Sequence, residues 1–450
     1  MTDPDASRVV ACSPCRPITK RRLAVETAVL LAVACLLVQT WLVSGTLVPY
    51  EIASASMAPT LLGPHHRVTC DDCGRPFSVG NDAAAITGDG VCPNCRHPED
   101  LFFGSPLGGD LVLLDRSVYR LRPPRRWEIA AFHPPRGEGP VVKRIVGLPR
   151  ETIEFRDGDV LVDGHRQRKN LAEQRALAVP VYDASFPPRL EPAPPPRWQA
   201  EPGSRWKYAD GVFSCYSASE ALDWLRYRHG RDARDEPVTD WCGYNQAWPN
   251  RGVAIHAVHD LLLSMRVKWL APGRLVVEMR PPGQRLSFTL RGAGKGAGSP
   301  GTMTCEAQAN GKPLECQAVE LPHPGNLELA VSTFDCQFLV AVNGRTLVCY
   351  PWEPEPKDGT DAGLPAIAAA GSGVEISHVC LYRDVYYARP LGVLAAWGFD
   401  RPAVLGADEF FCLGDNPELS VDSRSWPAGP GVPRGALLGK PVRREGRAKM

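Results

Sequence analysis

Hydrophobic residues dominate one long stretch near the start of the chain. Residues 28–48, AVLLAVACLLVQTWLVSGTLV, are 21 positions without a charge. At a rise of about 1.5 Å per residue, a helix of this length covers about 31 Å, close to the thickness of a bilayer hydrocarbon core. The pattern predicts a transmembrane helix, which we place at residues 23–48.

Basic residues flank this segment unequally. It is preceded by Arg16, Lys20, Arg21 and Arg22, whereas the next basic residue is Arg67. The positive-inside rule therefore puts residues 1–22 in the cytoplasm and everything after the helix outside. A cleaved signal peptide is the alternative, because Ala53-Ser54-Ala55 has the small-x-small pattern of a secretory cleavage site, although the apolar region of a signal peptide is usually only about 7–15 residues long.

Alternating apolar and polar positions predict short strands in the rest of the chain. The first set lies at Asp110–Asp115, Glu128–Phe132, Val141–Pro149 and Thr152–Gly164. Within the last of these, the pairs Asp157-Gly158 and Asp163-Gly164 are hairpin turn signals.

A second set of alternating segments lies between residues 261 and 387, with Asn343-Gly344 as a further turn signal. Their regular spacing predicts an antiparallel β-sandwich. We expect one short helix at Ser217–Arg228, with Ser217 as its N-cap. The predicted fold class is mainly β.

Composition narrows the possible partners. The formal net charge is +1 for 450 residues, so no strong field points to a nucleic acid, and we expect no nucleic-acid partner. The 15 cysteines are an odd number. At least one thiol is therefore unpaired within the chain, and a complete disulfide framework cannot account for all of them.

Three separated segments together form one set of sequence motifs. They are SASMAPTL at residues 54–61, VVKRIVGLP at residues 141–149 and LGDNPELSVDSR at residues 413–424. In this order, and behind an anchor with its N-terminus inside, they resemble the bacterial type I signal peptidases, or leader peptidases. The resemblance covers about half of the chain. Arg150 departs from it, because it stands where the family usually has glycine.

The resemblance implies a serine–lysine dyad, with Ser56 as nucleophile and Lys143 as general base. A serine hydroxyl is a weak nucleophile until a base accepts its proton, and a lysine can be that base near neutral pH only if burial lowers its pKa. Strand alternation gives both Lys143 and Arg144 apolar neighbours, so the family match makes this choice and the strand pattern does not.

The remaining site residues are also implied by the resemblance. The Ser54 hydroxyl and the Ser56 backbone N–H would donate to the oxyanion, and Ser420 would orient the lysine. A structural group near the site comprises Gly414, Asp415, Asn416, Asp422, Ser423 and Arg424. No cofactor is expected for catalysis.

Two C-x-x-C pairs form a second motif. Cys70 and Cys73 are separated from Cys92 and Cys95 by 18 residues, a spacing that matches a zinc ribbon. Four thiolates suit a closed, tetrahedral and structural Zn²⁺ site. Two disulfides are the alternative, since the segment is placed outside the cytoplasm.

The predicted organisation is a signal-peptidase catalytic domain in three parts, interrupted by two insertions. A cytoplasmic tail at 1–22 and the transmembrane helix at 23–48 come first. The three catalytic parts are 49–66, 101–166 and 391–450. The two insertions are a zinc-ribbon-like module at 67–100 and a linker with a β-sandwich at 167–390. The end of the sandwich resembles the last strands of concanavalin-A-like or laminin-G-like domains.

The resemblance implies a membrane-anchored serine endopeptidase that removes N-terminal signal peptides from exported preproteins. We expect it in the cytoplasmic membrane as a single-pass protein with its catalytic domain on the outer side. Its expected partners are preprotein signal peptides and membrane lipid, with the protein translocation channel as a further candidate. Two alternatives stay open: a processing peptidase of narrow specificity, and an inactive surface protein whose sandwich binds glycan or protein.

Overall fold

The computed structural model describes most of the chain. The described residues are 20–81, 89–101, 105–135, 137, 139–230, 236–245, 255–271, 273–292, 304–317, 326–354 and 362–443. Most of the predicted cytoplasmic tail, up to residue 19, lies outside them.

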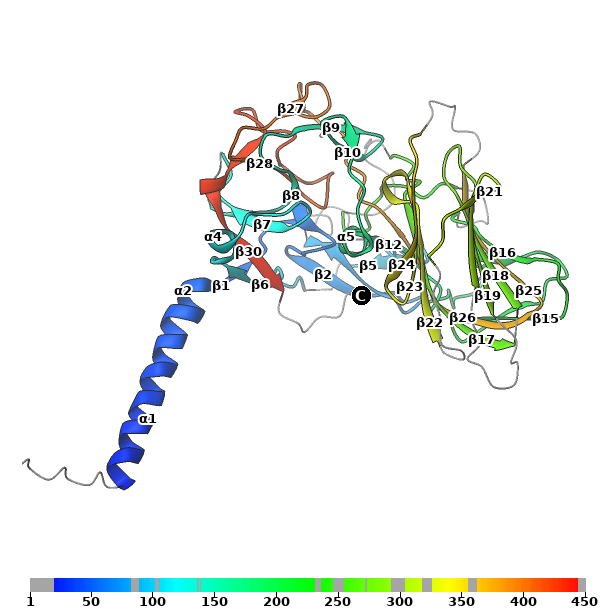
Figure 1. Cartoon of the computed structure of the whole chain (residues 1–450), viewed down its shortest axis with the longest axis horizontal. Coiled ribbons are helices and arrows are strands. Elements are labelled where there is room, and N and C mark those ends of the chain that lie inside the picture. Colours follow the sequence, from blue (N-terminus) through cyan, green and yellow to red (C-terminus); the bar gives the residue numbers. More distant parts are fainter. Residues whose placement is uncertain are drawn as a thin grey trace, which may run out of the picture.

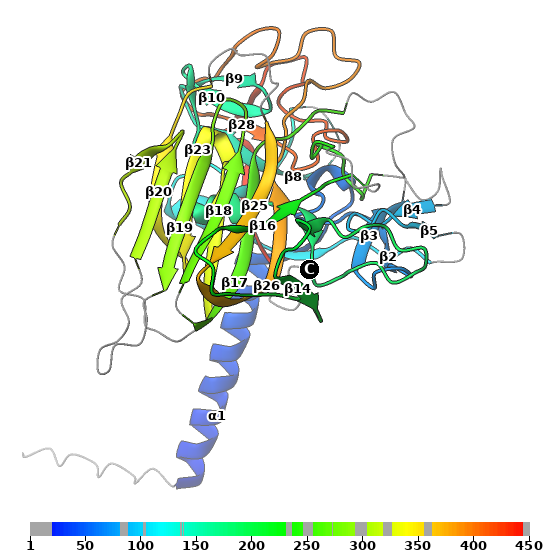
Figure 2. The ribbon, with the colours of Figure 1, turned by 90° about the vertical axis from the view of Figure 1, so that its right-hand side faces the viewer.

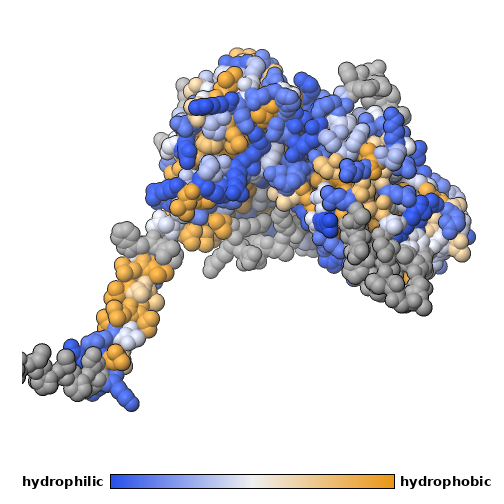
Figure 3. Space-filling view, viewed as in Figure 1, coloured by the Kyte–Doolittle hydropathy of each residue, from blue (hydrophilic) through white to orange (hydrophobic). Residues whose placement is uncertain are grey.

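A long apolar helix projects from the body of the molecule (Figures 1 and 3). It consists of α1 (Lys20–Leu37), a π-helical turn η1 (Val38–Val43) and α2 (Ser44–Thr46). None of the α1 side chains is buried. Among the described helices, the stretch Lys20–Thr40 alone is long and apolar enough to cross a bilayer, as a membrane anchor requires. The helix ends two residues earlier than predicted, because Leu47 and Val48 begin strand β1 (Leu47–Glu51).

A seven-stranded antiparallel sheet, the central sheet, follows the helix. Its strand order is β1-β6-β30-β7-β8-β28-β29. The strands are β6 (Leu111–Asp115), β7 (Ile129–Phe132), β8 (Val141–Gly147), β28 (Glu409–Leu413), β29 (Gly431–Pro433) and β30 (Leu437–Arg443), with the short helical turns α4 (Val118–Leu121) and η4 (Arg434–Ala436) beside them. Segments from both ends of the chain thus build one sheet, as Figure 1 shows.

A small four-stranded sheet packs beside the central sheet. It comprises β9 (Thr152–Arg156), β10 (Asp159–Val162), β11 (His165–Arg166) and β27 (Ala403–Val404). The predicted hairpin turn is confirmed, since Asp157 and Gly158 both have positive φ values, of 53° and 88°. Arg150 also has a positive φ, of 69°. This backbone conformation favours glycine, the residue that the resembled family usually carries there.

The cysteine-containing module, residues 65–101, consists of two small hairpins. One pairs β2 (His65–Thr69) with β3 (Pro76–Gly80), and the other pairs β4 (Asp89–Val91) with β5 (Pro98–Asp100). Their cysteine turns face one another around a small apolar core.

The predicted β-sandwich is confirmed. The eight-stranded sheet contains β12 (Val179–Asp183), β14 (Trp206–Ala209), β15 (Val212–Ser217), β17 (Leu261–Ala271), β22 (Asn326–Ser332), β23 (Gln337–Val342), β24 (Arg345–Pro351) and β26 (Ser372–Arg383). The seven-stranded sheet contains β13 (Trp198–Ala200), β16 (Asp223–Tyr227), β18 (Gly273–Arg280), β19 (Leu286–Gly292), β20 (Thr304–Ala309), β21 (Lys312–Leu314) and β25 (Gly363–Ala370), several of which lie side by side in Figure 2. Apolar side chains of both sheets form one core between them.

The helix predicted at Ser217–Arg228 is wrong. This segment ends β15 and then forms β16, whose Leu225 and Tyr227 are buried while Trp224 and Arg226 are less so. The period is therefore two, and β16 is paired on both sides, by β13 and β25. Tertiary pairing overrides the capping signal at Ser217.

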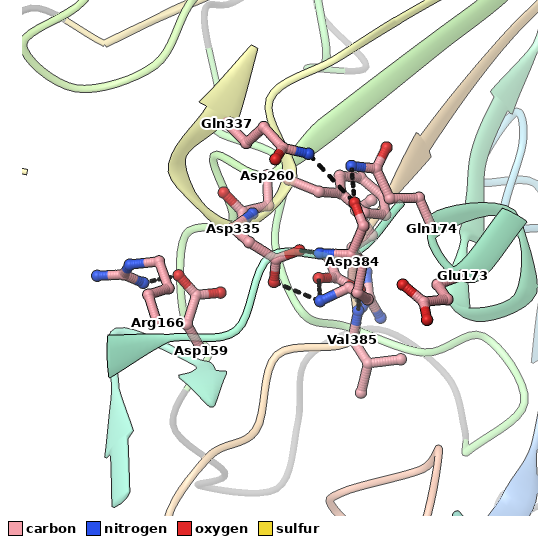
Figure 4. A network of polar contacts seen from close by, with 12 residues as sticks. Asp159, Arg166, Glu173, Gln174, Asp260, Asp335, Gln337, Asp384 and Val385 are labelled. Atoms are coloured by element: carbon pink, nitrogen blue, oxygen red, sulfur yellow. Dashed lines mark hydrogen bonds and ion pairs between the residues drawn. The ribbon is translucent and has the colours of Figure 1, made fainter. Parts of the chain in front are cut away.

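One buried ion cluster joins the sandwich to the central sheet. Lys169, directly before α5 (Leu171–Leu177), is paired with Asp335, and its Nζ lies 2.8 Å from Asp384 Oδ2. Gln174 and Gln337, both labelled in Figure 4, each donate a hydrogen bond at 3.1 Å to the Lys169 carbonyl.

The same Lys169 ammonium lies 4.8 Å from the centre of the Trp127 ring, which belongs to the core beside the central sheet. Burial raises the pKa of Asp384 to about 7. Lys169 is thus a buried cation that pairs with both Asp335 and Asp384.

We predict that Lys169→Met lowers the free energy of unfolding by about 3–5 kcal/mol, because it leaves buried carboxylates without their cation. The loss is expected to be smaller at pH 5 than at pH 8, since Asp384 is then mostly protonated. Denaturant unfolding of the purified protein at both pH values measures it.

The matched control is Lys268→Met, which removes an exposed pair with Glu375 and is expected to cost less than about 1 kcal/mol. Equal effects of the two substitutions would contradict the role given to Lys169.

Candidate active site

Three segments distant in sequence meet beside strands β8 and β28 of the central sheet. The short turn η2 (Ala55–Met57) follows β1, Lys143 lies in β8, and the loop 414–424 follows β28. Strands β8 and β28 are neighbours, with Leu413 opposite Arg144. The three sequence motifs are therefore brought together by strand pairing.

The turn that carries Ser56 is fixed by its backbone. The Ser56 carbonyl accepts a hydrogen bond from the Asn416 N–H at 3.1 Å, and the Ala55 carbonyl accepts one from Asn416 Nδ2 at 3.0 Å. Ser56 is buried, and its Oγ lies 3.2 Å from Ser54 Oγ. A Cβ on Gly63 would lie 2.6 Å from the Ser54 carbonyl carbon, so only glycine allows this close approach.

Lys143 is a buried amine. Its side chain is 3% exposed, and Nζ donates to Ser420 Oγ at 3.0 Å. Burial lowers the pKa of Lys143 to about 8, although the nearby Asp422 carboxylate acts in the opposite direction. A substantial fraction of this lysine is therefore neutral at mildly alkaline pH and can accept a proton.

Gly414 lies between the serine turn and the lysine's partner. A Cβ at this position would come within 2.3 Å of both the Ser56 carbonyl oxygen and Ser420 Oγ. The absence of a side chain thus lets the Ser56 turn and Ser420, which accepts from Lys143, contact the same Cα. Asp422 Oδ2 accepts from the Gly414 N–H at 3.1 Å and fixes this glycine from the other side.

A buried ion pair supports the loop. Arg424 and Asp422 are both fully buried and joined at 2.9 Å. Burial acts to raise the pKa of Asp422, but Arg424 outweighs it and holds that pKa below its usual value. Arg424 also donates to the Ala388 carbonyl at 2.7 Å and to the Pro417 carbonyl at 3.1 Å. Ser423 Oγ accepts from the Cys412 N–H at 2.9 Å. These residues fix the loop and do not touch Ser56.

Arg144 and Lys143 are adjacent in sequence, but their environments shift their pKa values in opposite directions. Arg144 Nε donates to Asp415 Oδ1 at 2.7 Å, and Nη1 donates to the Trp127 carbonyl at 2.6 Å. Burial acts against its charge, but the Asp415 carboxylate outweighs it and raises the pKa of Arg144. Arg144 is therefore a fixed cation that holds the loop, and only Lys143 is suited to proton transfer.

The sequence reasoning missed one contributor to this site. Asn245 lies in the stretch of chain that connects β16 to β17, and it forms hydrogen bonds with Asn416 and Glu418. It belongs to an irregular turn 171 residues before its partner Asn416. No periodicity or motif marks it.

The four cysteines of the small module form a compact cluster. Cys70, Cys73, Cys92 and Cys95 are buried, and all four Sγ atoms lie within 4.8 Å of one another. The Sγ atoms of Cys70 and Cys95 are 3.5 Å apart, and those of Cys73 and Cys92 are 3.7 Å apart. These separations are too long for disulfides, and they lie near the roughly 3.8 Å expected between tetrahedral ligands of Zn²⁺ at about 2.3 Å.

The two cysteine turns repeat the same backbone pattern. The Gly74 N–H donates to the Cys70 carbonyl and the Arg96 N–H donates to the Cys92 carbonyl, both at 2.9 Å. Gly74 and Arg96 both have positive φ values, of 74° and 67°. The donor set thus fits a four-thiolate metal site. A disulfide among the described residues joins Cys305 and Cys316, far from this module.

A cavity of about 680 Å³ is lined in part by residues that follow the serine turn in sequence. Pro59 and Thr60 line one end, while Phe77 of the cysteine module and Trp241 and Tyr244 of the insertion line other walls. Residues of the cysteine module and of the sandwich insertion therefore line this cavity, whereas Ser56, Lys143 and Ser420 are not among its lining residues.

Comparisons with known proteins agree on one family. Residues 104–192, which include Lys143, match the model of the family "Signal peptidase, peptidase S26". Signal peptidase I of Leptolyngbya laminosa is 33% identical over 69 residues, which are 14% of this chain and 34% of that protein. Probable signal peptidase I-1 of Synechocystis sp. is 30% identical over 95 residues, 19% of this chain and 46% of that protein. The chain thus spans between about a third and a half of the length of these relatives.

Solved structures are similar to this chain only at a low level. A carbohydrate-binding module, CBM66 from Bacillus subtilis, has a TM-score of 0.25 and 8% identity, covering 41% of this chain and 95% of that chain. The alginate lyase Aly36B has a TM-score of 0.25 and 9% identity over 42% of this chain and 86% of that chain. Neither similarity carries an argument about this protein. The family model and the curated relatives thus agree that part of this chain, including the segment with Lys143, is similar to the signal peptidase family, peptidase S26.

Proposed function

We propose that this protein is a membrane-anchored serine endopeptidase that removes N-terminal signal peptides from exported preproteins. The observation that carries the proposal is the environment of Lys143, a buried amine bonded to Ser420 beside the glycine that contacts the Ser56 turn. A serine hydroxyl and a neutral amine together supply what hydrolysis of a peptide bond needs, namely a nucleophile and a base.

In the proposed reaction, Ser56 Oγ attacks the carbonyl carbon before the scissile bond while Lys143 Nζ takes the hydroxyl proton. The C–N bond then breaks, and the Lys143 ammonium returns the proton to the leaving amine. A water molecule attacks the resulting ester and gives a proton to Lys143. The ester bond breaks, and Ser56 Oγ recovers its proton from Lys143. No cofactor takes part.

The negative charge that develops on the carbonyl oxygen requires donors. We assign this role to the Ser56 backbone N–H and the Ser54 hydroxyl, whose oxygen lies 3.2 Å from Ser56 Oγ. Ser420 orients the lysine. The loop residues Gly414, Asp415, Asn416, Asp422, Ser423 and Arg424 position these groups without touching the substrate.

The topology follows from the flanking charges. We propose a single-pass protein of the cytoplasmic membrane, with its basic N-terminus inside and the site on the outer side. Strand β1 begins directly after the helix and ends five residues before Ser56, so the site lies close to the membrane surface. Signal peptides of preproteins are the proposed substrates, and membrane lipid and the translocation channel are the proposed partners.

We further propose that Cys70, Cys73, Cys92 and Cys95 hold a structural Zn²⁺. The buried four-sulfur arrangement supports this assignment, because a closed site leaves no ligand position for substrate. The ion would stabilise the two small hairpins of the module.

The central test is cleavage of a preprotein by the purified full-length protein in detergent. Ser56→Ala and Lys143→Ala are each expected to lower kcat by at least about 10³-fold, and Ser54→Ala by about 10–10³-fold. Ser105→Ala, at an exposed position, is the control and is expected to match the wild type.

Equal cleavage by wild type and by Ser56→Ala would show the catalytic assignment to be wrong. Failure of the wild type on every preprotein, together with glycan binding by the intact chain, would favour the surface-binding interpretation. Cleavage of very few preproteins would favour a narrow-specificity processing peptidase, to which the two insertions lining the cavity could contribute.

We predict a pH profile governed by Lys143. Since its pKa is lowered to about 8 and only the neutral amine is active, kcat/KM should rise about tenfold per pH unit below pH 8 and level off above it. At pH 6 the rate should be about one hundredth of the plateau. Steady-state kinetics between pH 6 and pH 9.5 measure the profile, and a flat profile over this range is incompatible with Lys143 as the base.

We predict one zinc ion per chain by elemental analysis of the purified protein. Cys73→Ser should lower the zinc content to near zero and lower the unfolding temperature, whereas Cys349→Ser, at an exposed position, should keep both. A metal-free wild type whose four cysteines resist thiol reagents until reduced would support disulfides instead.

A further inference from the structure

Asn245 is a buried side chain that the sandwich insertion places against the catalytic loop. Its backbone N–H donates to the Cys242 carbonyl at 3.0 Å, which closes a tight turn. Its side chain is 6% exposed, and that of Asn416 is 2% exposed. The two amides therefore interact out of contact with solvent.

The two amides exchange reciprocal hydrogen bonds. Asn245 Nδ2 donates to Asn416 Oδ1 at 2.9 Å, and Asn416 Nδ2 donates to Asn245 Oδ1 at 2.6 Å. Asn245 Nδ2 also donates to Glu418 Oε2 at 2.6 Å. Both hydrogens of Asn245 Nδ2 thus have acceptors, which defines the orientation of its amide.

The orientation of Asn416 matters because its second amide hydrogen is used by the serine turn. Asn416 Nδ2 donates to the Ala55 carbonyl at 3.0 Å, while its backbone N–H donates to the Ser56 carbonyl at 3.1 Å. If the Asn416 amide turned over, its carbonyl oxygen would face the Ala55 carbonyl. Asn245 selects the orientation in which the Asn416 side chain holds Ala55, the residue directly before Ser56.

The Asn245 turn is itself held by the cysteine module. The Gly80 N–H donates to the Tyr244 carbonyl at 2.8 Å, and the Tyr244 hydroxyl donates to the Pro64 carbonyl at 3.2 Å. The Arg96 guanidinium lies 4.2 Å from the centre of the Trp241 ring. The turn therefore has a fixed position between the two insertions and the loop that follows Ser56.

We propose that Asn245 is a positioning residue of the active site, supplied by the insertion, which orients Asn416 and through it the nucleophile Ser56. The insertion then contributes to the chemical step and not only to substrate access. This inference rests on the proposed peptidase function.

The sharpest test replaces Asn245 by aspartate, which has the same shape but no donor. In Asn245→Asp, a carboxylate oxygen takes the place of Nδ2 and faces both Asn416 Oδ1 and the Glu418 carboxylate, so the repulsion is expected to displace the Asn416 side chain and weaken its hydrogen bond to Ala55. We expect kcat on a preprotein to fall about 10–100-fold with KM changed less than about threefold, because a small displacement of a reacting group is costly. The rate at which a serine-reactive active-site reagent acylates Ser56 should fall in parallel.

Two further variants separate positioning from folding. Asn245→Asp combined with Glu418→Gln removes the like charge and supplies a donor, and it should recover part of the lost kcat. Asn326→Asp, at an exposed position of β22, is the matched control and should leave kcat unchanged. The pH midpoint of kcat/KM should stay at its wild-type value in Asn245→Asp.

The outcomes distinguish this inference from the function on which it rests. If the wild type cleaves, Ser56→Ala does not, and Asn245→Asp keeps the wild-type kcat, the inference is overturned and the peptidase function stands. A loss of kcat that only accompanies a lower unfolding temperature, without recovery by Glu418→Gln, also overturns it. If the wild type cleaves no preprotein, the proposed function fails first.

Discussion

The candidate site depends on the burial of one amine, that of Lys143, among side chains whose charges are already paired. Lys143 is surrounded by two buried ion pairs, Arg144 with Asp415 and Asp422 with Arg424, whose members neutralise one another. Each pair satisfies its own charges, so neither supplies a carboxylate bonded to the lysine. Desolvation therefore dominates at Lys143, and its pKa falls to about 8. A carboxylate bonded to Nζ in place of the Ser420 hydroxyl would hold the amine protonated and unable to act as a base.

Close backbone approach is the second constraint. Gly414 and Gly63 both stand where a Cβ would meet the serine turn within 2.6 Å. These contacts, with the two hydrogen bonds from Asn416, hold the Ser56 turn through its main chain. Main-chain support leaves the Ser56 and Ser54 hydroxyls available, which suits a nucleophile and an oxyanion donor that must both face a substrate.

Much of this arrangement could be predicted from the sequence, and the failures have physical causes. Period-two alternation and Asp-Gly turns located β9 and β10, because local chemistry fixes hairpins. The apolar run located the anchor, with an error of two residues at its end. The helix expected at Ser217–Arg228 was wrong since pairing with β13 and β25 decided that segment. The strand pattern could not separate Lys143 from Arg144, because the difference lies in the distant residues Ser420 and Asp415. Asn245 was not predicted for the same reason, since its partners Asn416 and Glu418 are distant in sequence.

The positions at which the sandwich joins the small sheet explain how it can lie beside the candidate site without disturbing it. The chain leaves the small sheet after β11 and returns through Val385 and Tyr387, which pack in the same core as Ile153 and Val160. Lys169 and Asp384 therefore tie together the two ends of the insertion, 2.8 Å apart. We expect an insertion anchored at both ends by one ion cluster and one core to move little relative to the central sheet. Such a fixed insertion allows the side-chain amide of Asn245 to hold the loop that carries Asn416. A mobile insertion could not maintain the two reciprocal hydrogen bonds between these residues.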